Sequence, residues 1–226
     1  MTAARVTCVI PALNAAPTVA AVIGGVRASL PECRVTVIDD GSTDGTYTVA
    51  CPLADAILRF DRNRGKGAAL RAGLAVALGD RADVVLTIDA DGQHDTACAP
   101  ALVGALAGAD VAIGARDRSS EMPVGRRLTN KLSAAAVGYC IGQPVVDAQS
   151  GYRAMHASVA RDVMPRGNRY EFETEFLILA GRRGYRIAFV PIPTRYPHTV
   201  RSQFRSVRDS ARIVGTLWRF GMGAQH

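Results

Sequence analysis

The sequence contains no run of about 18 or more apolar residues, the length that a membrane-spanning helix needs. It also shows no secretory signal, because Met1–Arg5 runs directly into a short strand-like stretch. Its five cysteines are widely spaced and form no Cys-x-x-Cys pair, which argues against a disulfide framework or a zinc site. We therefore expect a cytoplasmic protein with reduced, mostly buried cysteines.

Lysine is scarce as well, since Lys66 and Lys131 are the only lysines among 27 basic residues. The net charge of +7 therefore comes from arginine, whose forked guanidinium suits phosphate oxygens. Nucleic acid, an anionic membrane and a phosphorylated small molecule are all partners that such a charge attracts. Charge alone does not choose among these three classes.

Short apolar stretches alternate with amphipathic ones, which predicts an α/β fold with a mostly parallel central sheet flanked by helices. The strands predicted in the first half are Arg5–Pro11, Arg34–Asp39, Ala56–Phe60, Val84–Asp89 and Val111–Arg116. The helices predicted between them are Thr18–Ser29, Thr43–Ala50 and Lys66–Leu78. No repeat or linker is visible, so residues 1–226 are expected to form a single domain.

Beyond residue 116 the alternation is less regular. The predicted elements are helices at Arg126–Gly138, Tyr170–Arg183 and Phe204–Phe220, an edge strand within Asp147–Met155, and a strand at Ile187–Arg195. Pro191 and Pro193 predict an edge position for the last strand, because proline donates no hydrogen bond to a neighbour. Polar clusters follow the first, second and fourth strands, at the sheet edge where open α/β folds bind ligands.

Two adjacent carboxylates, Asp39 and Asp40, end the second predicted strand and are followed by a glycine turn. Adjacent carboxylates repel each other, so a cation or hydrogen-bond donors must lie nearby. A nucleoside supplies such donors through a base N–H and the ribose hydroxyls. A strand-to-helix turn capped by its own side chains explains the same residues equally well.

A second acidic pair, Asp89 and Asp91, follows the fourth predicted strand, with Gln93 and His94 directly after it. Two carboxylates that converge on a turn, together with a diphosphate, form an oxygen-rich site suited to Mg²⁺ or Mn²⁺. Such an ion would neutralise a leaving diphosphate. The alternative is a loop of solvated acidic residues. Two acidic clusters that both follow strands argue against it, because such a placement would seldom arise twice by chance.

A third segment, Asn63–Leu70, places Gly65, Lys66 and Gly67 at a predicted helix start. Backbone N–H groups and the helix dipole at such a position favour an anion. The segment is not a Walker A loop, because the first glycine of that spacing is missing. Taken alone, it is explained more simply as an ordinary helix N-terminus.

In this order the three segments resemble the nucleotide-sugar half of family 2 glycosyltransferases, which have the GT-A fold. The matching patterns are Pro-x-x-Asn, Asp-Asp-Gly-Ser-x-Asp, Asn-x-Gly-Lys-Gly and Asp-Ala-Asp-Gly-Gln. The resemblance implies that the nucleotide is bound by Pro11, Ala12, Asn14, Asp39, Asp40, Lys66, Asp89 and Ala90. It also implies a Mg²⁺ or Mn²⁺ ion on Asp91 and Gln93, while Ala15 departs from the family, which often has glutamate there.

The second half resembles one branch of that family, the polyprenyl-phosphate type that includes dolichol-phosphate mannosyltransferases. The segments that carry this resemblance are Gly114–Arg116, Arg127–Asn130, Asp147–Arg153, Tyr170–Glu175 and Ser202–Arg205, with Arg208 and Asp209. It implies a polyprenyl-phosphate acceptor whose phosphate is held by Arg116, Arg127 and Arg201. Val200 and Gln203 depart from the branch, which often has glycine and lysine at these positions.

The residues expected to carry the chemistry are Asp91, Arg127, Asp147 and Glu175. A phosphate acceptor is already anionic, so it needs cationic side chains more than it needs a strong base. Asp147 and Glu175 would be general bases for a hydroxyl acceptor, or else buried partners of Arg153 or Arg127. We expect Asp147 and Gln149 near the sugar, and Glu175 in a local pair.

The last predicted helix, at about residues 204–221, is basic on one side and apolar on the other. Its basic stripe consists of Arg205, Arg208, Arg212 and Arg219, and Trp218 lies on the apolar side. The pattern fits a helix on an anionic membrane, and fits equally a helix docked on the domain with its arginines in water. The lipid acceptors of the branch favour the membrane.

These features predict an inverting, metal-dependent hexosyltransferase that takes a sugar from a UDP- or GDP-sugar and passes it to a polyprenyl phosphate. The protein is expected to be cytoplasmic and to bind peripherally to the cytoplasmic face of a membrane. Its nucleotide-sugar half is expected at about 1–116 and its acceptor half at about 117–204. A soluble or saccharide acceptor is an alternative. A sugar nucleotidyltransferase would need a glycine-rich basic loop after the first strand, which Pro11–Ala16 is not. An arginine-rich nucleic-acid-binding module would need aromatic platforms among its basic residues, and none is seen, so nucleic acid is not an expected partner.

Overall fold

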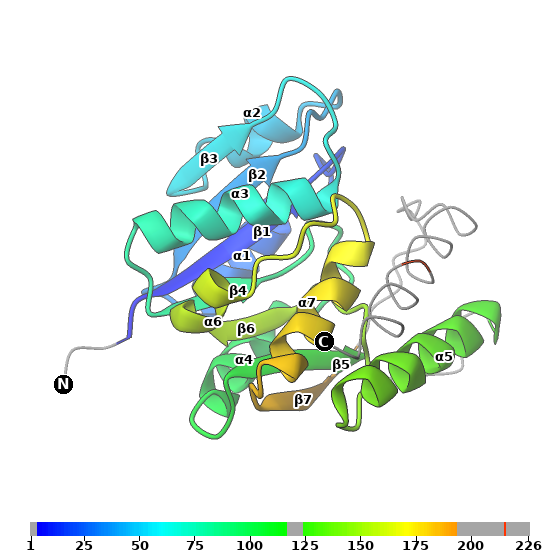
Figure 1. Ribbon diagram of the computed structural model, residues 1–226. Helices are drawn as coiled ribbons and strands as arrows, with labels where there is room; N and C mark the ends of the chain where they lie inside the picture. The colour runs from blue at the N-terminus through cyan, green and yellow to red at the C-terminus, as the bar shows by residue number, and fades with distance from the viewer. Residues whose placement is uncertain (1–3, 117–123, 194–214, 216–226) are drawn as a thin grey trace.

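The described part of the chain forms a sheet in which one inner strand runs against the direction of the others. The computed structural model describes residues 4–116, 124–193 and 215, without the side chains of 124–132 (Figure 1). Seven strands form one sheet in this part of the chain, in the order β3-β2-β1-β4-β6-β5-β7. They are β1 Val6–Ala12, β2 Arg34–Asp39, β3 Ala56–Arg59, β4 Val84–Thr87, β5 Val111–Arg116, β6 Arg153–His156 and β7 Ile187–Ile192.

Six of the seven strands run in parallel pairs, as the alternating sequence pattern predicts. β3, β2, β1 and β4 pair in parallel, and β5 pairs in parallel with β7. β6 is the exception, because it lies between β4 and β5 and is antiparallel to both. The predicted edge position of the 147–155 segment is therefore wrong, whereas β7 with its prolines does lie at an edge.

Helices cover both faces of the sheet, which gives three layers. They are α1 Val19–Ser29, α2 Thr46–Ala50, α3 Lys66–Gly79, α4 Ala99–Ala105, α5 Val124–Ile141, α6 Ala157–Asp162 and α7 Glu171–Arg182, with a 3₁₀ turn at Thr96–Cys98. Apolar residues of α1 and α4 pack on one face, and those of α3, α6 and α7 pack on the other. The sequence did not predict α4 or α6, which are short and begin without a recognisable capping residue.

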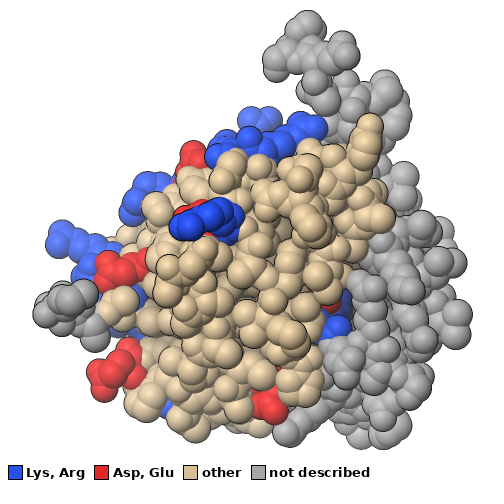
Figure 2. All heavy atoms as spheres, turned by 90° about the horizontal axis from the view of Figure 1, so that it is seen from below, with Lys and Arg blue, Asp and Glu red and all other residues tan. Residues whose placement is uncertain are grey.

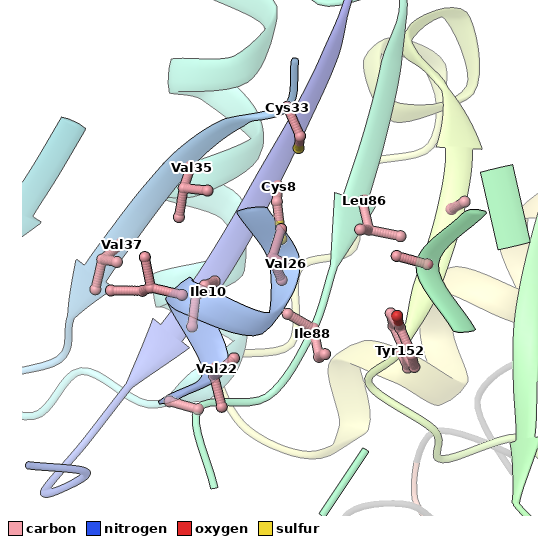
Figure 3. Close-up of a cluster of buried hydrophobic side chains, with 14 of the residues drawn as sticks. Cys8, Ile10, Val22, Val26, Cys33, Val35, Val37, Leu86, Ile88 and Tyr152 are labelled. Atoms are coloured by element: carbon pink, nitrogen blue, oxygen red, sulfur yellow. The ribbon is translucent and has the colours of Figure 1, made fainter. Parts of the chain in front are cut away.

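The two cores follow from the alternation of side chains along each strand. Cys8 and Ile10 of β1 point to the face covered by α1, where Figure 3 shows them among Val22 and Val26. Val9 between them points to α3 on the other face. There a Cβ at Gly73 would lie 2.1 Å from Val9, so glycine allows α3 to pack directly against the sheet.

No described helix combines the length and the apolar character required to cross a membrane. Figure 2 shows a face on which charged side chains are sparse, and on which basic groups lie beside acidic ones towards the margin. The ion pairs at the surface include Arg5 with Asp83 and Arg34 with Asp80. The predicted basic helix at about residues 204–221 lies outside the described residues, apart from position 215.

Candidate active site

The carboxyl ends of β1 and β2 bring the first predicted nucleotide-binding residues together. Pro11 pairs with Ile38 in the parallel register, and Ala12 pairs with Asp39. The backbone N–H of Asp40 donates to the carbonyl of Ala12 over 2.8 Å. Four residues that the sequence assigned to one site therefore share one edge of the sheet.

Asn14 locks the turn after β1 onto the turn after β2. Its side-chain oxygen accepts from the backbone N–H of Thr43 at 2.9 Å, and its own N–H donates to Ser42 Oγ at 2.9 Å. Its φ of 49° is left-handed, a conformation that asparagine tolerates better than most residues. Next to it, the N–H of Ala15 donates to Thr46 Oγ1 at 2.8 Å. Asn14 thus fixes the shape of this corner of the site.

The protein itself supplies donors to both carboxylates of the Asp39–Asp40 pair. Asp39 is fully buried, accepts from the N–H of Ser42 at 2.9 Å and lies 3.3 Å from Arg59 Nε. Asp40 is 2% exposed and accepts from the N–H groups of residues 64–65 at 2.6 and 2.9 Å. Burial nevertheless raises the pKa of Asp40 above its ordinary value. The structure therefore contains the strand-to-helix turn, capped by its own side chains, that was the alternative to a nucleoside site. Contacts of Asp39 and Asp40 with a nucleoside remain a prediction.

Lys66 lies between two carboxylates that come from distant parts of the chain. Its Nζ is 2.6 Å from Asp89 Oδ1 and 2.7 Å from Glu173 Oε1. Burial opposes the charge of Lys66, but the two carboxylates offset it and raise its pKa well above the ordinary value. Burial likewise opposes the charge of Asp89, yet Lys66 holds the pKa of that carboxyl below its usual range. The ammonium is therefore a fixed positive charge at the centre of the site.

The loop after β4 is held by contacts on two sides. Thr18 Oγ1 donates to the carbonyl of Ala90 at 2.6 Å, and Thr87 Oγ1 donates to that of Gly151 at 2.8 Å. A Cβ at Gly151 would lie 2.6 Å from each carboxylate oxygen of Asp89. Glycine at 151 therefore lets the Asp89 carboxylate rest directly against the backbone of the second half.

Asp91 is the carboxylate of the loop whose charge is least compensated. Burial and the neighbouring Asp89 raise the pKa of Asp91 to about 6, although its Oδ1 accepts from the N–H of Gln93 at 3.0 Å. His94 is 6% exposed, and burial lowers its pKa to about 4. A neutral imidazole is thus expected beside the two carboxylates.

The donor set of this loop fits a divalent cation only in combination with other ligands. Within the described ranges, no group of three or more His, Cys, Asp and Glu side chains is arranged to hold a metal ion. The uncompensated charge of Asp91 is nevertheless what a cation would relieve, and oxygens of a diphosphate would complete its coordination. The residues present therefore fit an ion that binds together with a nucleotide.

Arg116, at the end of β5, forms a forked pair with Asp147. Its Nε is 2.7 Å from Oδ2 and its Nη2 is 3.0 Å from Oδ1, and the N–H of Gln149 also donates to Oδ1 at 3.0 Å. Although burial opposes it, Arg116 holds the pKa of Asp147 below the usual range. The charge of Arg116 also reaches Asp89 and Asp91. Asp147 therefore has the environment of an orienting carboxylate and not of a base.

Glu175 pairs locally within the second half. It is 4% exposed, and its Oε2 accepts from the backbone N–H of Gly167 at 2.8 Å. Glu171, one helical turn earlier, accepts from the N–H groups of residues 168–169 at 3.1 and 3.3 Å. Both glutamates therefore shape the segment before α7, and a role of Glu175 as a base stays a prediction.

The Asn63–Leu70 segment is packed against the segment that precedes α7. A Cβ at Gly65 would lie 2.3 Å from the carbonyl oxygen of Asn168, and one at Gly67 would lie 2.4 Å from that of Gly167. The first turn of α3 is also occupied, because the N–H of Ala68 donates to the Asn168 carbonyl at 3.3 Å. This geometry is that of an ordinary helix start covered by protein.

Sequence reasoning did not assign Glu173 to the site, and it named Arg153 only as a possible partner of Asp147 or Glu175. Arg153 is 3% exposed and donates to the carbonyls of Ala148, Ser150 and Glu173. Both residues lie inside segments that carry the family resemblance, but the pattern does not say which glutamate of α7 faces inwards. The side chain of Arg127 and the whole of Arg201 lie outside the described residues.

A model of the family described as "Glycosyl transferase family 2" matches residues 7–164 of this chain. An undecaprenyl-phosphate mannosyltransferase of Micrococcus luteus is 30% identical over 237 residues, covering 98% of this chain and 96% of that protein. A polyprenol monophosphomannose synthase of Mycolicibacterium smegmatis is 29% identical over 83% of this chain and 76% of its own. The similarity to the first relative therefore extends over nearly the whole chain, and that to the second over most of it.

Among solved structures, the fold is similar to that of glucosyl-3-phosphoglycerate synthase from Mycobacterium tuberculosis. The TM-score is 0.77 at 23% identity, over 96% of this chain and 80% of that one. That protein was crystallised with Mn²⁺, UDP and glucosyl-3-phosphoglycerate. The match establishes a common fold.

Proposed function

This chain belongs to glycosyl transferase family 2 and has the GT-A fold, and from that premise we propose that it transfers a sugar from a UDP- or GDP-sugar to a polyprenyl phosphate. The two relatives described above are named for undecaprenyl-phosphate and polyprenol substrates. The observation that carries the proposal is the position of Arg116, a forked cation that Asp147 orients beside Asp89 and Asp91.

On the donor side, the nucleotide would lie along the carboxyl ends of β1, β2 and β4. Pro11, Ala12 and Asn14 line the first of these ends, and Asp39 and Asp40 line the second. Lys66, Asp89 and Ala90 line the third, next to the place of the diphosphate. The fixed charge of Lys66 favours a diphosphate there, because an ammonium stabilises a departing anion.

Asp91 and Gln93 would hold the Mg²⁺ or Mn²⁺ ion. When bound, such an ion supplies charge that neutralises the leaving nucleoside diphosphate. Support comes from the raised pKa of Asp91 and from the Mn²⁺ and UDP of the structurally similar synthase. The carboxylates of this chain bind and orient the donor, and Arg116 reduces their repulsion towards an anionic acceptor.

In the transfer itself, a phosphate oxygen of the acceptor would form a bond to the anomeric carbon while the bond from that carbon to the diphosphate breaks. The configuration would be inverted in one displacement. An ionised phosphate has no proton to lose, so no general base is required, which agrees with the paired states of Asp147 and Glu175. Arg116 would hold the acceptor phosphate, and Arg127 and Arg201 complete the proposed set.

A lipid acceptor implies that the protein works at a membrane surface. We place it peripherally on the cytoplasmic face, where nucleotide sugars and the phosphate end of the lipid meet. The basic, Trp218-containing stretch at about residues 204–221 is the proposed contact with anionic lipids.

Calorimetric titration with UDP and with GDP, each with Mn²⁺ or with a chelator, tests the donor site. One nucleotide should bind only when the metal is present, and Asp91→Ala should abolish that binding. Asp95→Asn is a matched control, because Asp95 caps the 3₁₀ turn of the same loop through the N–H of Ala97. If neither nucleotide binds under any metal condition, the proposed function is wrong.

The acceptor is tested by incubating the enzyme with the labelled sugar of that nucleotide and a short polyprenyl phosphate. Label should enter the lipid extract in a mild-acid-labile form. Transfer to water-soluble saccharides without transfer to the lipid would keep the glycosyltransferase assignment and overturn the proposed acceptor.

A further inference from the structure

One buried cation joins the two halves of the molecule. Lys66 starts α3 in the donor half, and its ammonium contacts Asp89 of the same half at 2.6 Å. On its other side it contacts Glu173 of α7, in the acceptor half, at 2.7 Å. The side chain of Glu173 is only 2% exposed, and that of Lys66 is 17% exposed. The ammonium is therefore shared between a donor-site carboxylate and a carboxylate that faces no solvent.

Glu173 is a costly residue to bury, so its ionised form must be compensated nearby. Lys66 provides one partner, and Arg153 approaches the same residue by donating to its carbonyl at 3.0 Å. A cavity of about 10 Å³ lies against Glu173 and is lined also by Thr87 and Gly151. Most of its other lining residues are apolar, so the Glu173 carboxylate depends on Lys66 for compensation of its charge.

The sharing of Lys66 determines how much negative charge the Asp89–Asp91 turn keeps. If Lys66 belonged to Asp89 alone, that carboxylate would be neutralised and would attract a divalent ion weakly. Because Glu173 also pairs with Lys66, the ammonium compensates only part of the negative charge of Asp89. The turn then keeps more of its negative charge than it would beside an ammonium paired with Asp89 alone.

We propose that Glu173 is a positioning residue: it holds Lys66 between the two halves, so that the Asp89–Asp91 turn keeps enough negative charge for a divalent cation on Asp91 and the ammonium stays available to a diphosphate. The inference rests on the proposed function for the identity of these ligands. Its basis in the structure is the pair of contacts on Lys66 and the burial of Glu173.

The test is a charge-deletion cycle of wild type, Lys66→Met, Glu173→Gln and the double variant. Mn²⁺ affinity at saturating nucleotide is measured by electron paramagnetic resonance, and nucleotide affinity at saturating Mn²⁺ by calorimetry. Glu173→Gln should weaken Mn²⁺ binding about tenfold, because Lys66 then pairs with Asp89 alone. Lys66→Met should strengthen Mn²⁺ binding about tenfold and weaken nucleotide binding, because two carboxylates lose their counter-cation. In the double variant Mn²⁺ binding should stay within about threefold of that of Lys66→Met, because Glu173 acts through Lys66 and has nothing to position once Lys66 is gone.

Glu171→Gln is the matched control, since it removes one carboxylate from the same helix and keeps an oxygen that can accept from Asn168. Circular dichroism and thermal melts establish that each variant is folded. Should Glu173→Gln melt at a lower temperature but bind Mn²⁺ and nucleotide as wild type does, Glu173 is structural and the inference is wrong. Effects that simply add in the double variant would contradict it as well. A wild-type protein that binds neither ligand would overturn the proposed function itself, which is a different outcome.

Discussion

Replacing Gly151 by alanine should displace Asp89 without disturbing the backbone. The new Cβ would lie 2.6 Å from both carboxylate oxygens, roughly 1 Å short of an ordinary contact. The backbone φ at Gly151 is not in the left-handed region, so alanine is compatible with the local conformation. The clash must therefore be relieved by movement of the Asp89 carboxylate, which breaks its 2.6 Å contact with Lys66.

The expected effects follow from this displacement. Overpacking of this size costs about 1–3 kcal/mol of folding free energy. A misplacement of roughly 1 Å at a reacting centre can lower the rate about 100-fold. We expect Gly151→Ala to lower metal-dependent nucleotide affinity and sugar transfer by one to two orders of magnitude, and to lower the melting temperature by only a few degrees.

Gly24→Ala is the control for this experiment. Gly24 lies in α1, and a Cβ added there would have no atom within 4 Å, so alanine should stabilise the helix by about 0.5–1 kcal/mol. Nucleotide binding should be unchanged in this variant. If Gly151→Ala bound nucleotide and transferred sugar like wild type, the position of Asp89 would not matter and the reasoning about this site would be refuted.

Two other predictions concern charged pairs. Asp147→Asn should raise the KM for the acceptor at least tenfold, because Arg116 loses its forked partner. The dependence of kcat on acidic pH should be the same as in wild type. Loss of that dependence in the variant would show that Asp147 is a base. Asp55 accepts from Val35 N–H at 2.7 Å and from Arg27 at 2.9 Å, and despite burial these donors lower its pKa. The contribution of Asp55 to the free energy of unfolding is thus complete above the unfolded pKa of about 3.9 and is lost as the pH falls through the lower folded value. The urea midpoint of Asp55→Asn should therefore depend less on pH below about 4 than that of wild type. An unchanged pH dependence would contradict this.

The sequence predicted the parallel strands well because each is a short apolar run bounded by turn residues. All five strands expected in the first half are present in the sheet. It misplaced β6, which was predicted at an edge but lies between β4 and β5 and contains Arg153. In the structure the guanidinium is buried and bonded to three carbonyls, which a single sequence does not reveal.

The candidate site was predicted in part for similar reasons. Motifs at strand ends must meet at one sheet edge, so Asp39 and Asp89 could be grouped from the sequence, whereas Arg116 was assigned through the family resemblance. Which partner each side chain takes depends on distances of a few ångström between segments far apart in the chain. The pairing of Arg116 with Asp147 and of Lys66 with Glu173 therefore became visible only in the structure.

The position of β6 has a consequence for biosynthesis. β4 is complete at Thr87, but its neighbour on one side begins only at Arg153. At ribosomal rates those intervening residues, about 65, take roughly 3–13 seconds to synthesise, during which one edge of β4 has no strand beside it. Open strand edges invite pairing with other chains. The nascent donor half is thus the form of this protein most exposed to aggregation, and truncated copies ending before residue 153 should be chaperone clients.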